Sequence, residues 1–124
     1  MLNDPPRYSP LVIDKLYRAS THPSLWNDAV LSVAQAVNAS AASLISLTPS
    51  RAISFAFTPG LPDAMVEAFP RYAGLNVRMR AMRDAGVMKV CTDYDHTSEE
   101  EMVRHPYYSK FLAPYGQGYY AGAM

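Results

Sequence analysis

Apolar residues in the first third of the chain recur at helical spacing. Ser9 followed by Pro10 predicts a helix start, because the serine oxygen can accept a free amide while proline loses no hydrogen bond there. This helix is expected to run to about Ala19. A second apolar stripe, with spacings of three and four, follows at Trp26, Ala29, Val30, Val33 and Val37. Two helices are therefore predicted before residue 38.

The next segment changes to the period of a β-strand. Residues 43–48 are short and apolar and end at Pro49, which indicates a strand. In residues 52–57 the large side chains of Ile53, Phe55 and Phe57 alternate with small ones, so one face of this segment is bulky. The simplest arrangement of the two segments is a β-hairpin.

Prolines, glycines and caps divide the following residues into short helices. A helix is predicted from Asp63, with a kink or break at Pro70, because proline lacks an amide hydrogen and crowds the preceding turn. Asn76 is a natural restart signal for a helix over residues 77–84. Thr97 with Glu100 matches a capping box and predicts another short helix.

The last third combines two expected strands with one further helix. Residues 86–92 are partly β-branched and bounded by Gly86, which predicts a third strand. After His105 and Pro106, the pairs Tyr107 with Phe111 and Tyr108 with Leu112 have i,i+4 spacing and predict a helix. A fourth strand is expected to begin at Tyr119.

This order lacks the β-α-β alternation of a parallel sheet, so it predicts an α+β fold with an antiparallel sheet and helices packed on one side. With 124 residues the chain fits a single domain, expected at residues 9–124 after a flexible lead at 1–8. No apolar run is long enough to span a bilayer, and residues 1–9 lack a signal-peptide core. We expect a cytoplasmic protein that does not enter membranes.

Charge gives no reason to expect direct binding of nucleic acid. The formal net charge is +0 at pH 7, so the molecule as a whole does not attract a polyanion. The charges are nevertheless grouped, with a basic stretch at residues 71–89 and an acidic stretch at 93–101. Two solvated faces that attract each other are the simpler interpretation of such runs.

Several short motifs carry a resemblance to a known family. They are residues 16–19 (LYRA), 23–26 (PSLW), 72–78 (YAGLNVR), 92–93 (TD) and 105–116 (HPYYSKFLAPYG). Together they resemble the PAS/GAF-like sensor domains at the N-termini of LuxR-type transcriptional regulators. The resemblance covers most of the chain, and none of its motifs is catalytic. It departs from the family at Val77, where relatives usually have proline in an Asn-Pro-Arg motif, and at Pro70, inside a helix that is normally uninterrupted.

The resemblance implies a regulatory sensor domain that binds a small molecule and controls an attached helix-turn-helix domain. Domains of this kind usually continue with further strands, a helical linker and the DNA-binding domain, so the last strand or strands and the effector are expected beyond Met124. DNA would then be contacted only through that missing domain. The other hypothesis is a dimerisation or protein-interaction scaffold without a physiological ligand, and a homodimer is expected.

Aromatic and methionine side chains supply the candidate ligand site, because rings with polar tips and flexible thioethers suit a mostly apolar pocket. The pocket is expected between the sheet face and the short helices, with these lining residues: Phe55, Phe57, Tyr72, Arg78, Met79, Met82 and Phe111. Packing in the core or at an interface is the alternative for any single ring. Arg78 or Arg80 could bind an anionic group of the ligand with two parallel bonds, whereas a surface salt bridge to the acidic stretch is the simpler interpretation.

The residues that could carry catalysis or metal binding lack the required spacing. His22, His96 and His105 show no metal-ligand pattern, and Cys91 has the character of a small core residue. The acidic stretch contains no complete calcium loop and suits helix first turns, where carboxylates oppose the helix dipole. We therefore expect no metal, no cofactor and no enzymatic activity.

Overall fold

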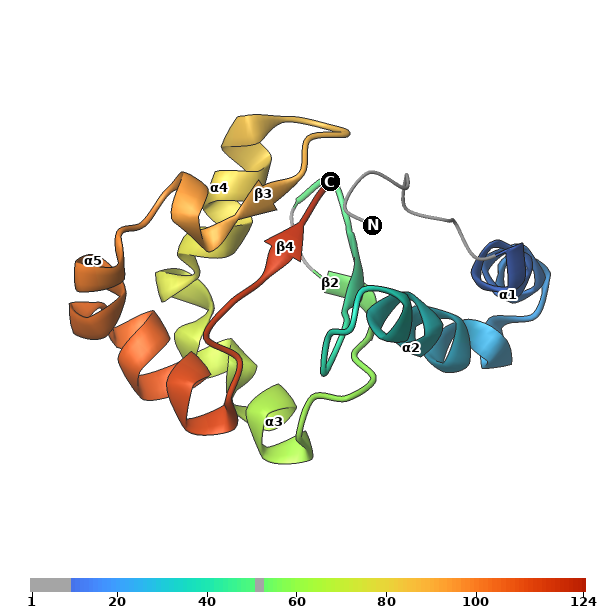
Figure 1. Cartoon of the computed structure of the whole chain (residues 1–124), viewed down its shortest axis with the longest axis horizontal. Helices are drawn as coiled ribbons and strands as arrows, with labels where there is room; N and C mark the ends of the chain where they lie inside the picture. Colours follow the sequence, from blue (N-terminus) through green and yellow to red (C-terminus); the bar gives the residue numbers. More distant parts are fainter. Residues whose placement is uncertain (1–9, 51–52) are drawn as a thin grey trace, which may run out of the picture. The chain divides into compact units, whose positions relative to one another are not determined.

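The chain has a mixed α+β architecture (Figure 1). The structure is a computed structural model and describes residues 10–50 and 53–124. It divides into two compact units, Met1–Leu61 and Pro62–Met124. The α+β prediction is confirmed, whereas the expected lead at residues 1–8 and the cap at Ser9 lie outside the described residues. That residues 9–124 act as a single sensor domain stays a prediction.

The first unit begins with two packed helices. They are α1 (Pro10–Thr21) and α2 (Trp26–Ala36), separated by the 3₁₀ turn Pro23–Leu25. Ala19, Ala29 and Ala34 are fully buried between or beneath them, and such small side chains let two helices approach closely. The Lys15 ammonium also lies 3.1 Å from the Asp28 carboxylate, across the pair.

The predicted hairpin is confirmed in the same unit. Strands β1 (Leu44–Leu47) and β2 (Ile53–Phe57) are antiparallel, with Leu44 opposite Phe57 and an irregularity between residues 46 and 47. The Phe57 ring stacks on Trp26 of α2 at a centroid distance of 6.1 Å. Gly60 follows with a φ of +88°, and a Cβ there would lie 2.4 Å from the Ser40 carbonyl oxygen. The turn after the hairpin therefore requires glycine.

Helices α3 and α4 open the second unit. α3 spans Asp63–Tyr72 and continues through Pro70, so the predicted break at that residue is wrong. The missing proline amide removes one hydrogen bond, but the helix ends only two residues later, where the 3₁₀ turn Ala73–Leu75 begins. The restart at Asn76 is confirmed, because its side chain accepts from the Met79 amide at 3.0 Å and α4 runs over Val77–Ala85.

The third predicted strand is much shorter than expected. Only β3 (Cys91–Thr92) is paired, with β4 (Ala121–Gly122), in an antiparallel ladder. Gly86 and Met88 have φ values of 94° and 63°, so the backbone before β3 turns instead of extending. The start of β4 lies two residues after Tyr119, where the sequence placed it.

Short helices complete the second unit. The 3₁₀ turn η3 (Asp93–Asp95) has a capping box formed by Thr92 and Asp95. Helix α5 (Glu99–Arg104) begins one residue later than predicted, because Ser98 and not Thr97 is its cap. Acidic residues fill its first turn, as the sequence predicted. A π-helix, η4 (Tyr107–Leu112), and the 3₁₀ turn Ala113–Tyr115 follow.

The strands form two separate two-stranded sheets in the described residues. One belongs to each unit, so the single antiparallel sheet expected from the sequence is not found as one continuous ladder. In the second unit the left-handed backbone at Met88 interrupts the extended segment before Cys91, and β3 pairs with β4 over two residues. No helix in the described part of the chain is long and apolar enough to cross a membrane.

The core of the second unit centres on Phe111, which is 1% exposed. Its ring stacks on Tyr72 with centroids 4.8 Å apart and lies 5.4 Å from the Tyr107 ring. Phe69 and Tyr115 contact it from two further directions. The wider π-helical turn thus places one phenylalanine at the centre of four aromatic rings.

Candidate functional site

The residues predicted to line a ligand pocket fall in both units. Phe55 and Phe57 lie on β2 of the first unit with ring centroids 5.7 Å apart, and Phe55 is 47% exposed. Tyr72 and Phe111 lie in the second unit and stack on each other. Phe111 therefore packs in the core, which was the alternative to a pocket-lining role. That the predicted residues line one shared pocket stays a prediction.

The three predicted residues on α4 have distinct surroundings. The Met79 amide is bonded to the Asn76 cap, so the backbone of this residue starts the helix. The Met82 sulfur contacts the backbone of β4, since a Cβ at Gly122 would lie 2.6 Å from it. Arg78 is bonded to Asp93 and is only 11% exposed. Its partner does belong to the acidic stretch, but the salt bridge is buried and not on the surface.

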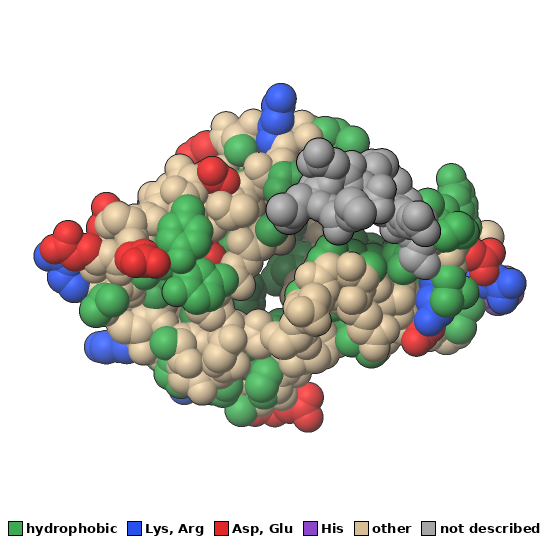
Figure 2. All heavy atoms as spheres, viewed as in Figure 1, with side chains coloured by type: hydrophobic (Ala, Val, Ile, Leu, Met, Phe, Trp, Pro, Cys, Tyr) green, Lys and Arg blue, Asp and Glu red, His purple; other side chains and the backbone are tan. Residues whose placement is uncertain are grey.

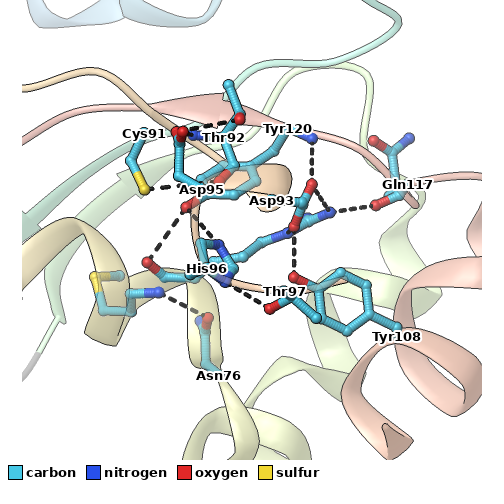
Figure 3. Close-up of polar contacts among 12 residues, drawn as sticks. Asn76, Cys91, Thr92, Asp93, Asp95, His96, Thr97, Tyr108, Gln117 and Tyr120 are labelled. Carbon is cyan, nitrogen blue, oxygen red and sulfur yellow. Dashed lines mark hydrogen bonds and ion pairs between the residues drawn. The ribbon is translucent and has the colours of Figure 1, made fainter. Parts of the chain in front are cut away.

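The Arg78 side chain belongs to a polar cluster within the second unit. Figure 3 shows the cluster around its partner Asp93, with Tyr108, Gln117 and Tyr120. The Arg78 Nε lies 2.8 Å from Asp93 Oδ1 and its Nη2 lies 3.2 Å from Oδ2, which is a bidentate pair. The same Nη2 donates to the Gln117 carbonyl oxygen at 3.0 Å. The Arg78 guanidinium carbon also lies over two aromatic rings, 5.5 Å from the Tyr108 centroid and 4.6 Å from the Tyr120 centroid.

The Asp93 carboxylate is 1% exposed and fully bonded. Besides the two bonds from Arg78, it accepts from the Tyr108 hydroxyl at 2.6 Å and from the Tyr120 amide at 2.8 Å. A carboxylate has about four acceptor positions, and these four donors occupy them. Asp93 therefore has no position left for a substrate proton or a metal ion.

Burial changes the acidity of the tyrosines around this carboxylate. Burial, together with the hydrogen bond to Asp93, raises the pKa of Tyr108 to about 12. The pKa of Tyr107 is also raised to about 12, mainly because its phenol is removed from water. Burial and a hydrogen bond with Cys91 raise the pKa of Tyr120 further. These phenols stay protonated at neutral pH, and those of Tyr108 and Tyr120 donate hydrogen bonds to Asp93 and to the Arg78 carbonyl oxygen.

A surface pocket of about 430 Å³ lies beside the cluster, between α4 and the segment that contains β3 and η3. Its apolar lining comes from Val77, Ala81, Ala85 and Cys91. Its polar lining comes from four other side chains: Arg80, Asp84, Asp95 and His96. Within the described residues, Arg80 and Asp84 have no hydrogen-bond or ion-pair partner. The pocket thus offers one cation and one carboxylate without partners in the described residues, beside an apolar lining.

Two of the pocket residues also contact the polar cluster. The His96 Nε2 lies 3.4 Å from the Tyr120 hydroxyl, and its Nδ1 lies 2.7 Å from the Thr97 hydroxyl (Figure 3). Cys91 is buried and pairs with Gly122 across the β3–β4 ladder. The described residues contain no group of three or more histidines, cysteines or acids that could hold a metal ion.

The sequence singled out Arg78 but missed its buried partners. Asp93 was interpreted as a solvated helix-start charge, and Tyr120 as part of a strand. The one signal present is that Asp93 lies two residues after apolar Cys91 and outside the charged run at residues 99–101. Comparison with protein-family models, curated proteins and solved structures finds no match to this chain.

Proposed function

We propose that this chain is a PAS/GAF-like regulatory sensor domain that binds a small molecule and controls an attached helix-turn-helix domain. The proposal places the protein in the cytoplasm and leaves contact with DNA to the attached domain. It is supported by the resemblance of the motifs at residues 16–26, 72–78 and 92–116 to such domains.

The observation that carries the proposal is the pocket between α4 and the 91–96 segment. Its volume of about 430 Å³ is large enough for a small molecule, which would bind there at the surface because the pocket is open to solvent. An apolar lining with a few polar groups can orient a ligand that has both characters. The neighbouring charges support binding over catalysis, because Asp93 is saturated by its four donors.

A thermal-shift screen of a metabolite library against the whole chain tests this function. Binding at the pocket is expected to raise the melting temperature, because a ligand that binds only the folded state stabilises it. Ala81→Trp fills the pocket and is expected to remove the shift, whereas Arg83→Ala, on α4 but outside the pocket lining, is expected to keep it. A library without binders, or shifts that survive Ala81→Trp, would contradict binding at this site.

A dimerisation scaffold is the second candidate, and a specific observation favours it. Apolar side chains lie on the surface among the charged ones (Figure 2), and they include Ile53 and Phe55 of β2. Each strand of the two-stranded sheets also has an edge without a partner in the described residues, and such edges can pair with another chain. Light scattering over a range of protein concentrations tests this candidate. A monomer at every concentration would remove it.

A further inference from the structure

We infer that residues 117–122 form a strap whose attachment depends on what occupies the α4 pocket. The inference rests on the proposed function, since it describes how a ligand at that site would be sensed. The strap contains Gln117, Tyr120 and strand β4, and every contact used below lies within the second unit.

The strap is held by two residues that stand next to the pocket lining, one on each side of the pocket. From α4, the Arg78 guanidinium donates to the Gln117 carbonyl oxygen at 3.0 Å. From the opposite wall, the Asp93 carboxylate accepts from the Tyr120 amide at 2.8 Å. Arg78 is next in sequence to pocket residue Val77, and Asp93 lies between pocket residues 91 and 95. A change in the separation of the walls therefore acts on both attachments.

The two walls are joined to each other by the same pair of residues. The bidentate bonds between Arg78 and Asp93 are 2.8 and 3.2 Å long, and the side chains are 11% and 1% exposed. Buried ion pairs tolerate little separation, because each charge that loses its partner stays away from water. An occupant that spreads the pocket would thus weaken the attachments of the strap before it disturbed the helix itself.

A third contact links a pocket side chain directly to the strap. The His96 Nε2 lies 3.4 Å from the Tyr120 hydroxyl, and the two rings are tilted with centroids 6.1 Å apart. There is little free space around β4, because a Cβ at Gly122 would lie 2.6 Å from the Met82 sulfur and 3.1 Å from the Tyr120 ring. Close packing of this kind transmits a displacement instead of absorbing it.

The test replaces the unknown ligand by a side chain that fills the pocket. In the full chain, Ala81→Trp places an indole against the 91–96 wall, and Arg83→Trp adds the same ring to α4 outside the pocket lining. Hydrogen exchange of the Tyr120 amide is then measured by NMR, with the amides of α2 in the first unit as internal references. We expect exchange at Tyr120 to accelerate about tenfold or more in Ala81→Trp and to stay unchanged in Arg83→Trp.

A second, milder variant controls for general unfolding. Ala85→Leu also enlarges a pocket-lining side chain, and it is expected to accelerate the same amide by a smaller factor. Unchanged exchange at Tyr120 in both folded pocket variants would overturn the strap, as would equal acceleration in Arg83→Trp. These results are independent of the metabolite screen, whose failure would count against the proposed function and not against the mechanical link.

Discussion

Replacing Asp93 by asparagine is the most direct test of the polar cluster. The change removes one negative charge from a site that is 1% exposed, while the Arg78 guanidinium keeps its positive charge. The single amide oxygen of asparagine can accept about two hydrogen bonds, so at least two of the four present donors lose their acceptor. The NH₂ group of the asparagine side chain, which can only donate, would also lie against other donors.

The expected loss of stability is large. Breaking a buried ion pair by removing one partner typically costs about 3–5 kcal/mol, and we expect Asp93→Asn to lower the free energy of unfolding by that amount. Whole domains are stable by only about 5–15 kcal/mol, so this loss would be a large fraction of the total. Arg78→Met in the same chain is expected to reduce the effect of Asp93→Asn, because no uncompensated guanidinium is then left.

Urea unfolding followed by circular dichroism measures these free energies. Asp95→Asn is the matched control, since Asp95 is an exposed carboxylate that only caps Thr92, and its loss is expected to cost about 1 kcal/mol. Fluorescence of Trp26, the single tryptophan, reports on the first unit and provides a second probe. If Asp93→Asn cost no more than Asp95→Asn, the assignment of Asp93 as the anchor of the second unit would be wrong.

Three further predictions concern the same unit. Gly122→Ala is expected to lower the free energy of unfolding in urea by about 1 kcal/mol, because its Cβ would lie 2.6 Å from the Met82 sulfur, which must move. Gly118→Ala is the control, expected to stay near neutral because its Cβ would have no atom within 4 Å. Phe111→Ala is expected to cost about 3–5 kcal/mol by leaving a cavity among four rings, and a loss below about 1 kcal/mol would contradict that packing. The folded state holds the Tyr108 proton to a pKa of about 12, through burial and the bond to Asp93, while the unfolded value is 10.0. The stability that this proton contributes is therefore fully present below pH 10 and is lost between pH 10 and 12. In urea unfolding over this pH range, Tyr108→Phe is expected to show a smaller decline in the free energy of unfolding.

Local signals in the sequence were sufficient for most of the helices and for the hairpin. Asn76 caps α4 through a bond only three residues away, and Ile53, Phe55 and Phe57 alternate along β2. Where local signals competed, the outcome was less certain, since α3 continues through Pro70 despite the lost hydrogen bond. Burial of Met65 and Ala68 on one face of α3 offsets that loss.

The candidate site was much less accessible to sequence reasoning. The sequence indicates an anionic partner for Arg78 or Arg80, in a ligand or in the acidic stretch, but the actual partner Asp93 lies 15 residues from Arg78 and resembles any acidic residue at a helix start. The pocket residues Arg80, Asp84 and His96 carry no motif. They become neighbours only when α4 packs against the segment that contains β3.

What this sequence determines by itself is the set of elements whose hydrogen bonds close within about four residues, together with the alternating pattern of the hairpin. What only the tertiary structure decided is which charges are buried. Asp93 meets Tyr108 and Tyr120 across 15 and 27 residues of chain, and the length of β3 depends on β4 being present to pair with it. The physical reason is that a carboxylate becomes stable in the interior only when several donors converge on it, and no local pattern records that convergence.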